Sequence, residues 1–405
     1  MTHRGENKAF DQVLEVLIEN GLEGMATAME VIVNEAMKLE RADFLRAEPH
    51  ERTADRRGYA NGYKDKSVRS RIGELGLRIP QVRDLADPQA GFYPKSLEKG
   101  LRSEQALKLA VAEMYVQGVS TRRVKEITRQ LCGLEVSSMQ VSRAAKLLDE
   151  ELEAWRGRPI GEIPYLILDA RYEKIRHGGS VIDCAVLVAI GVREDGKRSV
   201  LGVSVSLSEA EVHWREFIES LQRRGMHGVV EVTSDDHKGL RAAMQARLTG
   251  ALWQRCQCHL QRNAQAYVPK KEMKAGVAAE IRGIFNATDR VEAEQRLERM
   301  VKRYERSAPA LSRWAEENIP EGLTVFELPE KHRRRLRTNN CAERLNEEIR
   351  RRTRVVRLFP NEASLLRLVS AVLAEKSEEW ESGKVYLNME DEWPEENRIY
   401  RKDVA

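Results

Sequence analysis

Apolar positions in the first 50 residues recur every three or four residues. Phe10, Leu14 and Ile18 form one stripe, and a second stripe runs from Met25 to Met37 after a glycine-containing break at 21–24. This spacing places the apolar side chains on one face of a helix. Residues 1–50 are therefore predicted to form two amphipathic helices, whose apolar faces need a partner in the same chain or in a second copy.

The same helical period returns over residues 104–158. Gly118 and Gly133 interrupt it, and Ser120 and a serine at 137 or 138 suit helix N-caps. We expect three helices, the third extending toward Trp155. The second and third resemble a helix-turn-helix, which inserts its second helix into the major groove, although many helix hairpins share this shape. The side chains expected to contact DNA are Arg122, Arg123, Gln140, Arg143 and Lys146.

After residue 159 the pattern changes to alternating, β-branched runs at 165–175, 181–192 and 199–207, which Gly-Gly and Asp-Gly turns separate. A helix, a strand, a second helix and a short strand follow, which gives the order β-β-β-α-β-α-β within residues 159–259. Helical periods resume over 260–335 as an all-helical insertion, and residues 336–405 supply a closing helix and C-terminal helices. The fold class is therefore α/β (α+β) with a mainly helical N-terminal region.

Positive charge is concentrated in one block although the whole chain is nearly balanced, with 68 basic and 64 acidic residues and a net charge of +4. Residues 331–357 hold eleven basic residues and three acids. Such a block is either an exposed helix face or a surface for a polyanion, and nucleic acid is the first partner to consider. The side chains expected to contact DNA here are Arg344, Arg350, Arg351, Arg352 and Arg354.

A second basic segment covers residues 51–103, where tyrosines and glycines lie between the basic side chains. This composition suits contact with phosphates, and it equally suits a flexible, solvated linker. If the segment contacts DNA, the residues expected to do so are Arg56, Arg57, Lys64 and Lys66.

Composition excludes several classes of protein. Charged residues make up 33% of the 405 residues, and no apolar run approaches the ~20 residues of a membrane helix. The first residues lack the apolar core of a signal peptide. Five cysteines without framework spacing fit a reducing compartment. A cytoplasmic protein without disulfides or a membrane partner is expected.

Three acids occupy notable positions in the predicted order of elements. Asp169 lies inside the first strand among apolar residues, Asp235 ends the fourth strand, and Glu343 begins the closing helix. Each has an ordinary structural explanation, as a paired acid, a helix cap or a helix N-terminal acid. Together they would meet at the ends of adjacent strands, where carboxylates favour Mg²⁺ or Mn²⁺. Two such ions support phosphodiester transfer.

These residues lie in motifs that resemble the Mutator-type transposases of bacterial insertion sequences. The motifs are Leu168-Asp169-Ala170, the stretch from Ser234 to Leu240, Trp253 to His259, and Thr338-Asn339-x-x-x-Glu343-Arg344-x-Asn346. The resemblance implies a ribonuclease-H-like core with an inserted helical domain, and an Asp169, Asp235 and Glu343 triad binding two Mg²⁺ ions, with Mn²⁺ as a substitute. It further implies double-stranded DNA partners, namely terminal inverted repeats and target DNA, and a homodimer acting on paired ends. No small-molecule substrate is expected.

The cluster Cys256-x-Cys258-His259 raises the possibility of zinc, but no second Cys/His pair lies at finger spacing. We therefore predict no structural zinc. Cys256 and His259, together with His237, are instead expected to support the active site. Two rival functions stay open: a catalytically silent DNA-binding regulator derived from a transposase, and a hydrolytic nuclease of the same fold.

Overall fold

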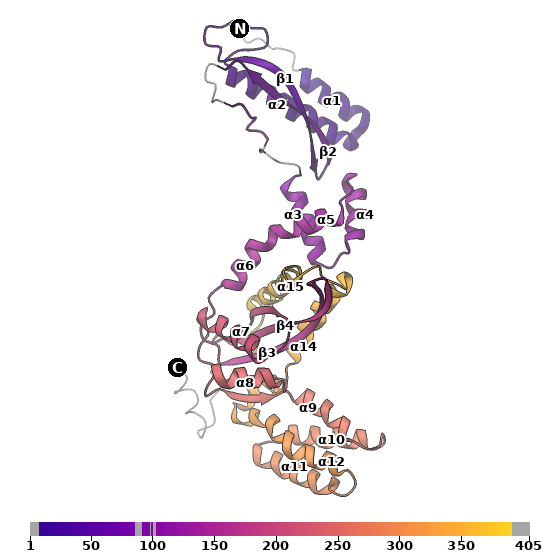
Figure 1. Cartoon of the computed structure of the whole chain (residues 1–405), viewed down its shortest axis with the longest axis vertical. Coiled ribbons are helices and arrows are strands. Elements are labelled where there is room, and N and C mark those ends of the chain that lie inside the picture. Colours follow the sequence, from indigo (N-terminus) through magenta and orange to yellow (C-terminus); the bar gives the residue numbers. More distant parts are fainter. Residues whose placement is uncertain (1–7, 86–90, 98, 100–102, 391–405) are drawn as a thin grey trace. The chain divides into compact units, whose positions relative to one another are not determined.

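The computed structural model describes residues 8–85, 91–97, 99 and 103–390. The chain divides into two compact units, residues 1–147 and 148–405, and each is described by itself (Figure 1). The described chain contains no helix long and apolar enough to cross a membrane.

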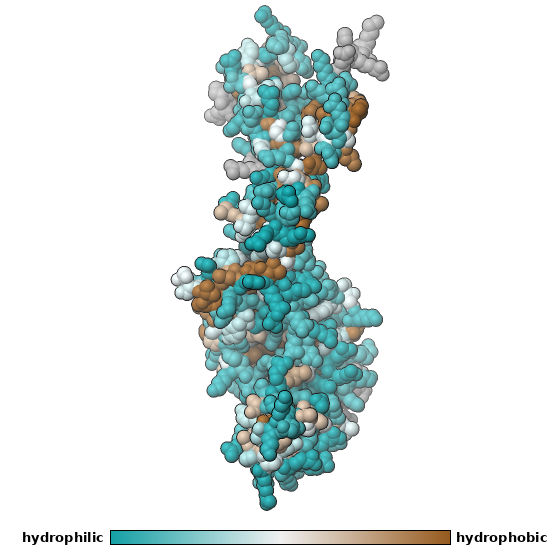
Figure 2. Space-filling model, turned by 90° about the vertical axis from the view of Figure 1, so that its right-hand side faces the viewer, coloured by the Kyte–Doolittle hydropathy of each residue, from teal (hydrophilic) through white to brown (hydrophobic). Residues whose placement is uncertain are grey.

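The first unit begins with the two expected helices, α1 (Lys8–Asn20) and α2 (Met25–Leu45), joined by a short 3-10 turn. α1 buries none of its residues, and its apolar side chains are exposed, Ile18 by 81%. Figure 2 shows brown apolar patches of this kind in the first unit. The predicted amphipathic helices are therefore present, and the outer face of α1 stays uncovered in a single chain.

Residues 59–83 form a β-hairpin, so the linker alternative was wrong for this part of the basic segment. β1 (Tyr59–Ser70) pairs antiparallel with β2 (Gly73–Arg83). The hairpin packs on α2 around Met37, and the Glu30 carboxylate accepts a hydrogen bond from the backbone N–H of Gly76 at 2.6 Å. Alternate residues are buried in β2 and at the end of β1, a pattern that the interleaved charges and glycines of the sequence concealed.

Three helices complete the first unit: α3 (Gln105–Val116), α4 (Thr121–Cys132) and α5 (Ser138–Ala145). Ser120 caps α4 and Ser137 caps α5, and Gly133 ends α4 at φ 67°. The expected continuation of the third helix to Trp155 was wrong. A 3-10 turn at Lys146–Leu148 separates α5 from α6 (Asp149–Gly157), and α6 belongs to the second unit.

The second unit is built on a five-stranded mixed sheet in the order β5-β4-β3-β6-β7. β3 (Tyr165–His177), β4 (Ser180–Val192) and β5 (Arg198–Ser206) form the expected antiparallel meander. β6 (Glu231–Ser234) and β7 (Leu252–Arg255) then add parallel to β3. The mixed α/β character predicted from the sequence is thus confirmed.

Helices cover both faces of this sheet because both sets of alternating side chains are apolar. Leu166, Leu168 and Leu187 pack against α7 (Glu211–Arg223) and α8 (Lys238–Arg247). Ile167, Val186 and their neighbours face α14 (Asn340–Val356) and α15 (Glu362–Ser382). In Figure 1, α7 and α8 accordingly lie on one side of the strands and α14 and α15 on the other.

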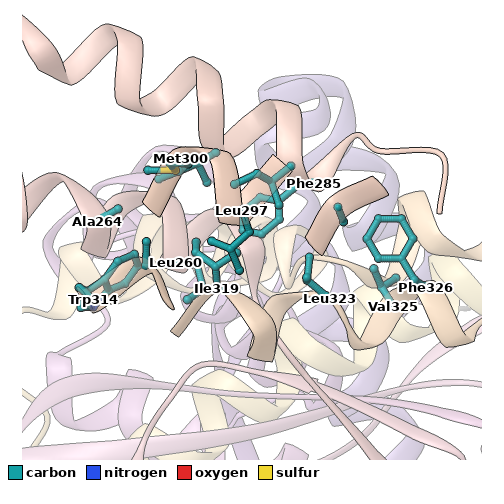
Figure 3. Packing of buried hydrophobic residues seen from close by; sticks show 14 of the residues in the cluster. Leu260, Ala264, Phe285, Leu297, Met300, Trp314, Ile319, Leu323, Val325 and Phe326 are labelled. Atoms are coloured by element: carbon teal, nitrogen blue, oxygen red, sulfur yellow. The ribbon is translucent and has the colours of Figure 1, made fainter. Parts of the chain in front are cut away.

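The segment between β7 and α14 is helical, as expected. It contains α9 (Gln257–Ala264), α10 (Met273–Phe285), α11 (Arg290–Tyr304), α12 (Pro309–Asn318) and α13 (Glu330–Leu336). Figure 3 shows their shared core, in which Leu260 of α9 lies with Phe285, Leu297 and Ile319. This core makes α9 a fixed connection between the insertion and the end of β7.

Candidate active site

Asp169 and Asp235 occupy equivalent positions on two neighbouring parallel strands. Ile167 of β3 pairs with Thr233 of β6, and each aspartate lies two residues further along its own chain. β6 ends at Ser234, directly before Asp235, whereas β3 continues to His177, so both aspartates lie where the parallel pairing of the two strands ends. The end of a parallel strand is where α/β sheets bind ligands. Strand register alone therefore brings the two predicted carboxylates together.

A single amide group joins these two carboxylates. The Asn339 Nδ2 lies 3.3 Å from Asp169 Oδ1 and 3.3 Å from Asp235 Oδ1 and donates a hydrogen bond to each. Cys256, at the N-cap of α9, donates its thiol proton to Asn339 Oδ1 at 2.9 Å. This bond fixes the orientation of the amide, so Cys256 positions Asn339 and thereby both aspartates.

Glu343 lies in the first turn of α14 and reaches the aspartates through His259. The His259 Nδ1 lies 2.5 Å from Asp235 Oδ1, and its Nε2 lies 3.7 Å from Glu343 Oε1. Arg262 approaches the same Glu343 oxygen at 3.6 Å. The imidazole of His259 therefore stands between the second and third acids of the predicted triad.

The electrostatics of the pair are those of two acids that lack a strong cation. Desolvation, followed by the charge of Asp235, raises the pKa of Asp169 to about 7. The contact with Asp235 raises the pKa of His259 above its usual value against the effect of burial. Asn346 on α14 donates a hydrogen bond to Asp169 Oδ2 at 2.5 Å and partly offsets the shift. Neutral amides, rather than lysine or arginine, therefore surround Asp169.

The compact group of potential metal ligands differs from the predicted triad. In the described chain, ligand atoms of Asp235, Cys256 and His259 lie within 4.8 Å of one another. Cys256 is a poor ligand in this state because it donates its proton to Asn339, whereas metals bind the thiolate. His237 lies elsewhere, at the N-cap of α8 with its Nδ1 3.8 Å from Glu209.

Two asparagines of the site received no role from sequence reasoning. Asn339 and Asn346 both lie in the Thr338 to Asn346 motif, and Asn339 is fully buried. A buried asparagine needs hydrogen-bond partners, but the sequence does not say that these partners are the two aspartates. The signal available was the position of both amides within one helical turn of Glu343.

Comparison with known proteins identifies the family. The family model described as "Transposase, Mutator family" matches residues 1–383. The chain belongs to the Mutator family of transposases. The transposase for insertion sequence element IS406 of Burkholderia multivorans is 55% identical over 96% of this chain and 99% of that protein. The transposase for ISRM5 of Rhizobium meliloti is 41% identical over 96% and 97%.

Among solved structures, a chain of the simian T-cell lymphotropic virus intasome in complex with PP2A regulatory subunit B56 gamma matches 39% of this transposase and 49% of that chain. The two are 14% identical, with a TM-score of 0.17.

The structure divides the predicted DNA-contacting arginines of the transposase's basic block into two groups. Arg344, Arg350, Arg351 and Arg354 are exposed on α14. Arg352 is only 3% exposed and pairs with Glu348 and with Glu375, the latter at 3.7 Å. The expected DNA contact of Arg352 is therefore corrected: its guanidinium joins α14 to α15 and is not accessible to DNA.

In the first unit of the transposase, most of the predicted DNA-contacting side chains are exposed. The Gln140 side chain already has an intramolecular role: its Oε1 accepts a hydrogen bond from the Ser137 N–H at 2.8 Å and completes the capping box of α5. Arg56 donates to the backbone carbonyls of Glu48, at 3.1 Å, and of Glu51, and Lys66 donates to the Tyr93 hydroxyl at 3.1 Å. The exposed remainder are Arg57, Lys64, Arg122, Arg123, Arg143 and Lys146.

Proposed function

We propose that this transposase cleaves and joins DNA with a DDE triad of Asp169, Asp235 and Glu343 on a ribonuclease-H-like core. The observation that carries the proposal is the pair of carboxylates at equivalent positions of neighbouring parallel strands, both hydrogen-bonded to Asn339. Glu343 approaches from α14, on the far side of His259. Three acids from three elements would not converge there for packing alone.

The residues fit divalent ions with a preference for oxygen ligands. Asp169 and Asp235 repel each other, no lysine or arginine pairs with them in the described chain, and this repulsion contributes to the raised pKa of Asp169. Asp169, Asp235 and Glu343 would hold two Mg²⁺ ions, with Mn²⁺ as a substitute. Such ions polarise the phosphoryl group and activate the attacking oxygen in phosphodiester transfer.

The protein's own residues contribute orientation and charge. Asn339 and Asn346 hold both Asp169 oxygens, which prevents the carboxylate from rotating away from Asp235. His259 keeps the Asp235 oxygen at a fixed position, and this contact raises the pKa of the imidazole, which favours its protonated form. Arg262, whose side chain is 68% exposed beside Glu343, offers a second positive charge to the DNA.

The DNA partners that we propose are the element's terminal inverted repeats and the target DNA. The helix-turn-helix of α4 and α5 presents the exposed Arg143 and Lys146, and α14 presents Arg350 and Arg354. A homodimer would act on paired ends, and the uncovered apolar face of α1 is consistent with a second copy. The proposed role of His237 is support of the active site from the N-cap of α8, where its nearest acid is Glu209 and not a member of the triad.

The decisive experiment is end cleavage and strand transfer by purified protein with Mg²⁺ or Mn²⁺. Asp169→Asn, Asp235→Asn and Glu343→Gln should abolish both reactions and leave end binding intact, because each change removes charge but little volume. Glu347→Gln is the matched control: Glu347 is exposed one helical turn later, and its loss should leave measurable activity.

Three results would contradict the proposal in different ways. End binding without any cleavage by the wild type indicates a silent regulator. Cleavage without strand transfer from pre-cleaved ends indicates a hydrolytic nuclease. If Glu347→Gln is inactive and Glu343→Gln is active, the third ligand lies one helical turn later.

A further inference from the structure

A basic pocket lies beside the first turn of α14, next to the site described above. Its volume is about 360 Å³. Five polypeptide segments contribute to it: the start of β5, α13, the α13–α14 turn, the start of α14, and the chain after α15. The lining residues are Arg198, Arg334, Arg335, Thr338, Asn340, Cys341, Arg344 and Tyr386.

Four guanidinium groups converge on this pocket, and no carboxylate lines it. In the described chain, these four arginines form no ion pair and their side chains donate no hydrogen bond to a protein group. Elsewhere in the second unit, buried arginines are neutralised by acids, as Arg255 is by Asp236 and Glu321. Four unneutralised charges around one hollow repel each other, which an anionic ligand would relieve.

Aromatic stacking holds two of these guanidinium groups in place. Arg198 lies over the rings of Trp380 and Tyr386, 4.4 and 4.1 Å from their centroids. Arg335 lies 5.0 Å from the centroid of the same tyrosine. The Tyr386 hydroxyl donates to the Arg335 carbonyl at 3.1 Å, which fixes the ring. Pre-ordered guanidinium groups lose little side-chain entropy when they bind a ligand.

The pocket adjoins the carboxylates through α14. Arg344 follows Glu343 directly, and Asn340, which lines the pocket, accepts a hydrogen bond from the Cys258 thiol at 3.5 Å. The N-terminal end of the 17-residue α14 also opens here, and the positive end of a helix dipole favours anions. A DNA strand that reaches Glu343 would therefore pass this pocket within a few nucleotides.

We propose that this pocket binds a backbone phosphate of the DNA strand held in the active site. The inference rests on the proposed function and adds a specific contact outside the triad. Guanidinium groups match the oxygens of a phosphodiester with paired, charge-assisted hydrogen bonds. The Thr338 hydroxyl and the Asn340 amide supply further polar groups at the rim. The contact positions the strand and reads no base.

Arginine modification tests the pocket directly in the full-length protein. Phenylglyoxal labelling followed by mass spectrometry measures the reactivity of each arginine with and without a duplex that carries the element end. Bound DNA should slow labelling of Arg334, Arg335 and Arg344 about tenfold and leave the exposed Arg313 of α12 unchanged. Equal labelling of the pocket arginines in DNA-saturated protein would overturn the inference.

Binding measurements give the second test. The double variant Arg334→Gln/Arg344→Gln should bind the end duplex about tenfold more weakly. The plot of log K against log salt should also become less steep, by ~0.9 for each phosphate that is no longer neutralised. Lysine at both positions should restore the slope. Arg313→Gln is the control for simple loss of surface charge, and unchanged affinity and slope in the double glutamine variant would refute a phosphate contact.

These outcomes separate the pocket from the triad. Full binding by the double glutamine variant, together with cleavage that still depends on Glu343, refutes the pocket alone. Absence of DNA binding by the wild type refutes the proposed function and the pocket together. The control for an occupant from the same chain uses the acidic residues Glu392, Glu395 and Glu396. If their replacement by glutamine exposes pocket arginines that were protected without DNA, the phosphate assignment is wrong.

Discussion

Glu231 is a fully buried carboxyl in β6 that has no cationic partner in the described chain. Its Oε1 lies 2.9 Å from the Thr233 hydroxyl, which also lies 2.7 Å from the Leu336 carbonyl. A hydroxyl has one proton, so Thr233 cannot donate to both oxygens at once, and Oε2 of Glu231 has no hydrogen-bond partner in the described chain. These surroundings penalise a charged carboxylate more than a neutral, protonated carboxyl. Burial raises the pKa of Glu231 well above its usual value, which favours this neutral form.

The stability of the folded protein should therefore fall as pH rises. Below about pH 4.5 both states hold the proton; above it the unfolded chain releases the proton while the folded chain retains it, until the raised folded pKa is passed. Glu231→Gln removes this loss and should stabilise the protein by about 1–3 kcal/mol at pH 8, with little effect near pH 4. Thermal unfolding at several pH values measures it, with the exposed Glu194→Gln as control. If the difference in melting temperature between the wild type and Glu231→Gln is the same at pH 5 and at pH 8, the buried carboxyl is already ionised and this explanation is wrong.

Cys256 has a structural explanation that does not require zinc. Its hydrogen bond with Cys258, followed by burial, raises the pKa of the Cys256 thiol, which keeps it a donor to Asn339. We predict well under one zinc per chain in chelator-treated, folded protein. Cys256→Ser retains a donor and should keep most of the cleavage activity, whereas Cys256→Ala should lose it. One tightly held zinc per chain by elemental analysis would contradict this prediction.

At the scale of elements, the close contact between α7 and α8 places the end of β6. A Cβ at Gly239, in the first turn of α8, would lie 2.4 Å from the Glu209 carbonyl oxygen and 2.8 Å from the Glu211 nitrogen. Both contacts are with backbone, which cannot rotate away. Glycine is thus required at this position, because α8 approaches the backbone that leads into α7 too closely for a Cβ.

Gly239→Ala should destabilise the protein by about 1–3 kcal/mol, as overpacking does. It should also reduce cleavage at temperatures where the variant is folded, since α8 must move away from α7 and Asp235 lies four residues earlier. Gly276→Ala in α10 is the control: no atom lies within 4 Å of its added Cβ, and a helix interior gains up to ~1 kcal/mol from alanine. Equal melting temperatures for both variants would mean that the α7–α8 contact is not rigid.

At the scale of the whole molecule, the division into residues 1–147 and 148–405 separates the helix-turn-helix from the carboxylates. Under the proposed function, DNA recognition by α4 and α5 and phosphodiester chemistry at the carboxylates would belong to different units. α5 lies in the first unit with the hairpin, and its exposed Arg143 has no partner within the described chain that would hold it away from DNA.

Residues 1–147 alone should bind the element end, with an affinity that falls steeply with salt. Arg143→Ala should lower the preference for the cognate end over random DNA, by about tenfold if the guanidinium reads a guanine. Arg143→Lys should keep the salt dependence and lose part of the preference, because a lysine cannot form the bidentate contact. Electrophoretic mobility shifts with cognate and shuffled duplexes measure both. Retention of full preference in Arg143→Ala would place base reading on another element.

Local patterns in the sequence determined most of the elements of this protein. Alternation of apolar residues fixed the strands of the sheet, and serine and glycine fixed the ends of α4 and the start of α5, because both signals act within a few residues. The positions of Asp169 and Asp235 followed as well, since parallel neighbours bring equivalent positions to one edge. The hairpin at 59–83 was missed because charged and glycine residues on its open face hid the alternation of the buried face.

Only the tertiary structure decided which side chains are shared between distant segments. Asn339 joins Asp169 to Asp235 across 170 and 104 residues of chain. Arg352 looks like any arginine of the basic block until α15 buries it. The four arginines of the basic pocket come from β5, α13 and α14. Periodicity and composition report on neighbours along the chain, whereas these contacts depend on how helices pack on the two faces of the sheet.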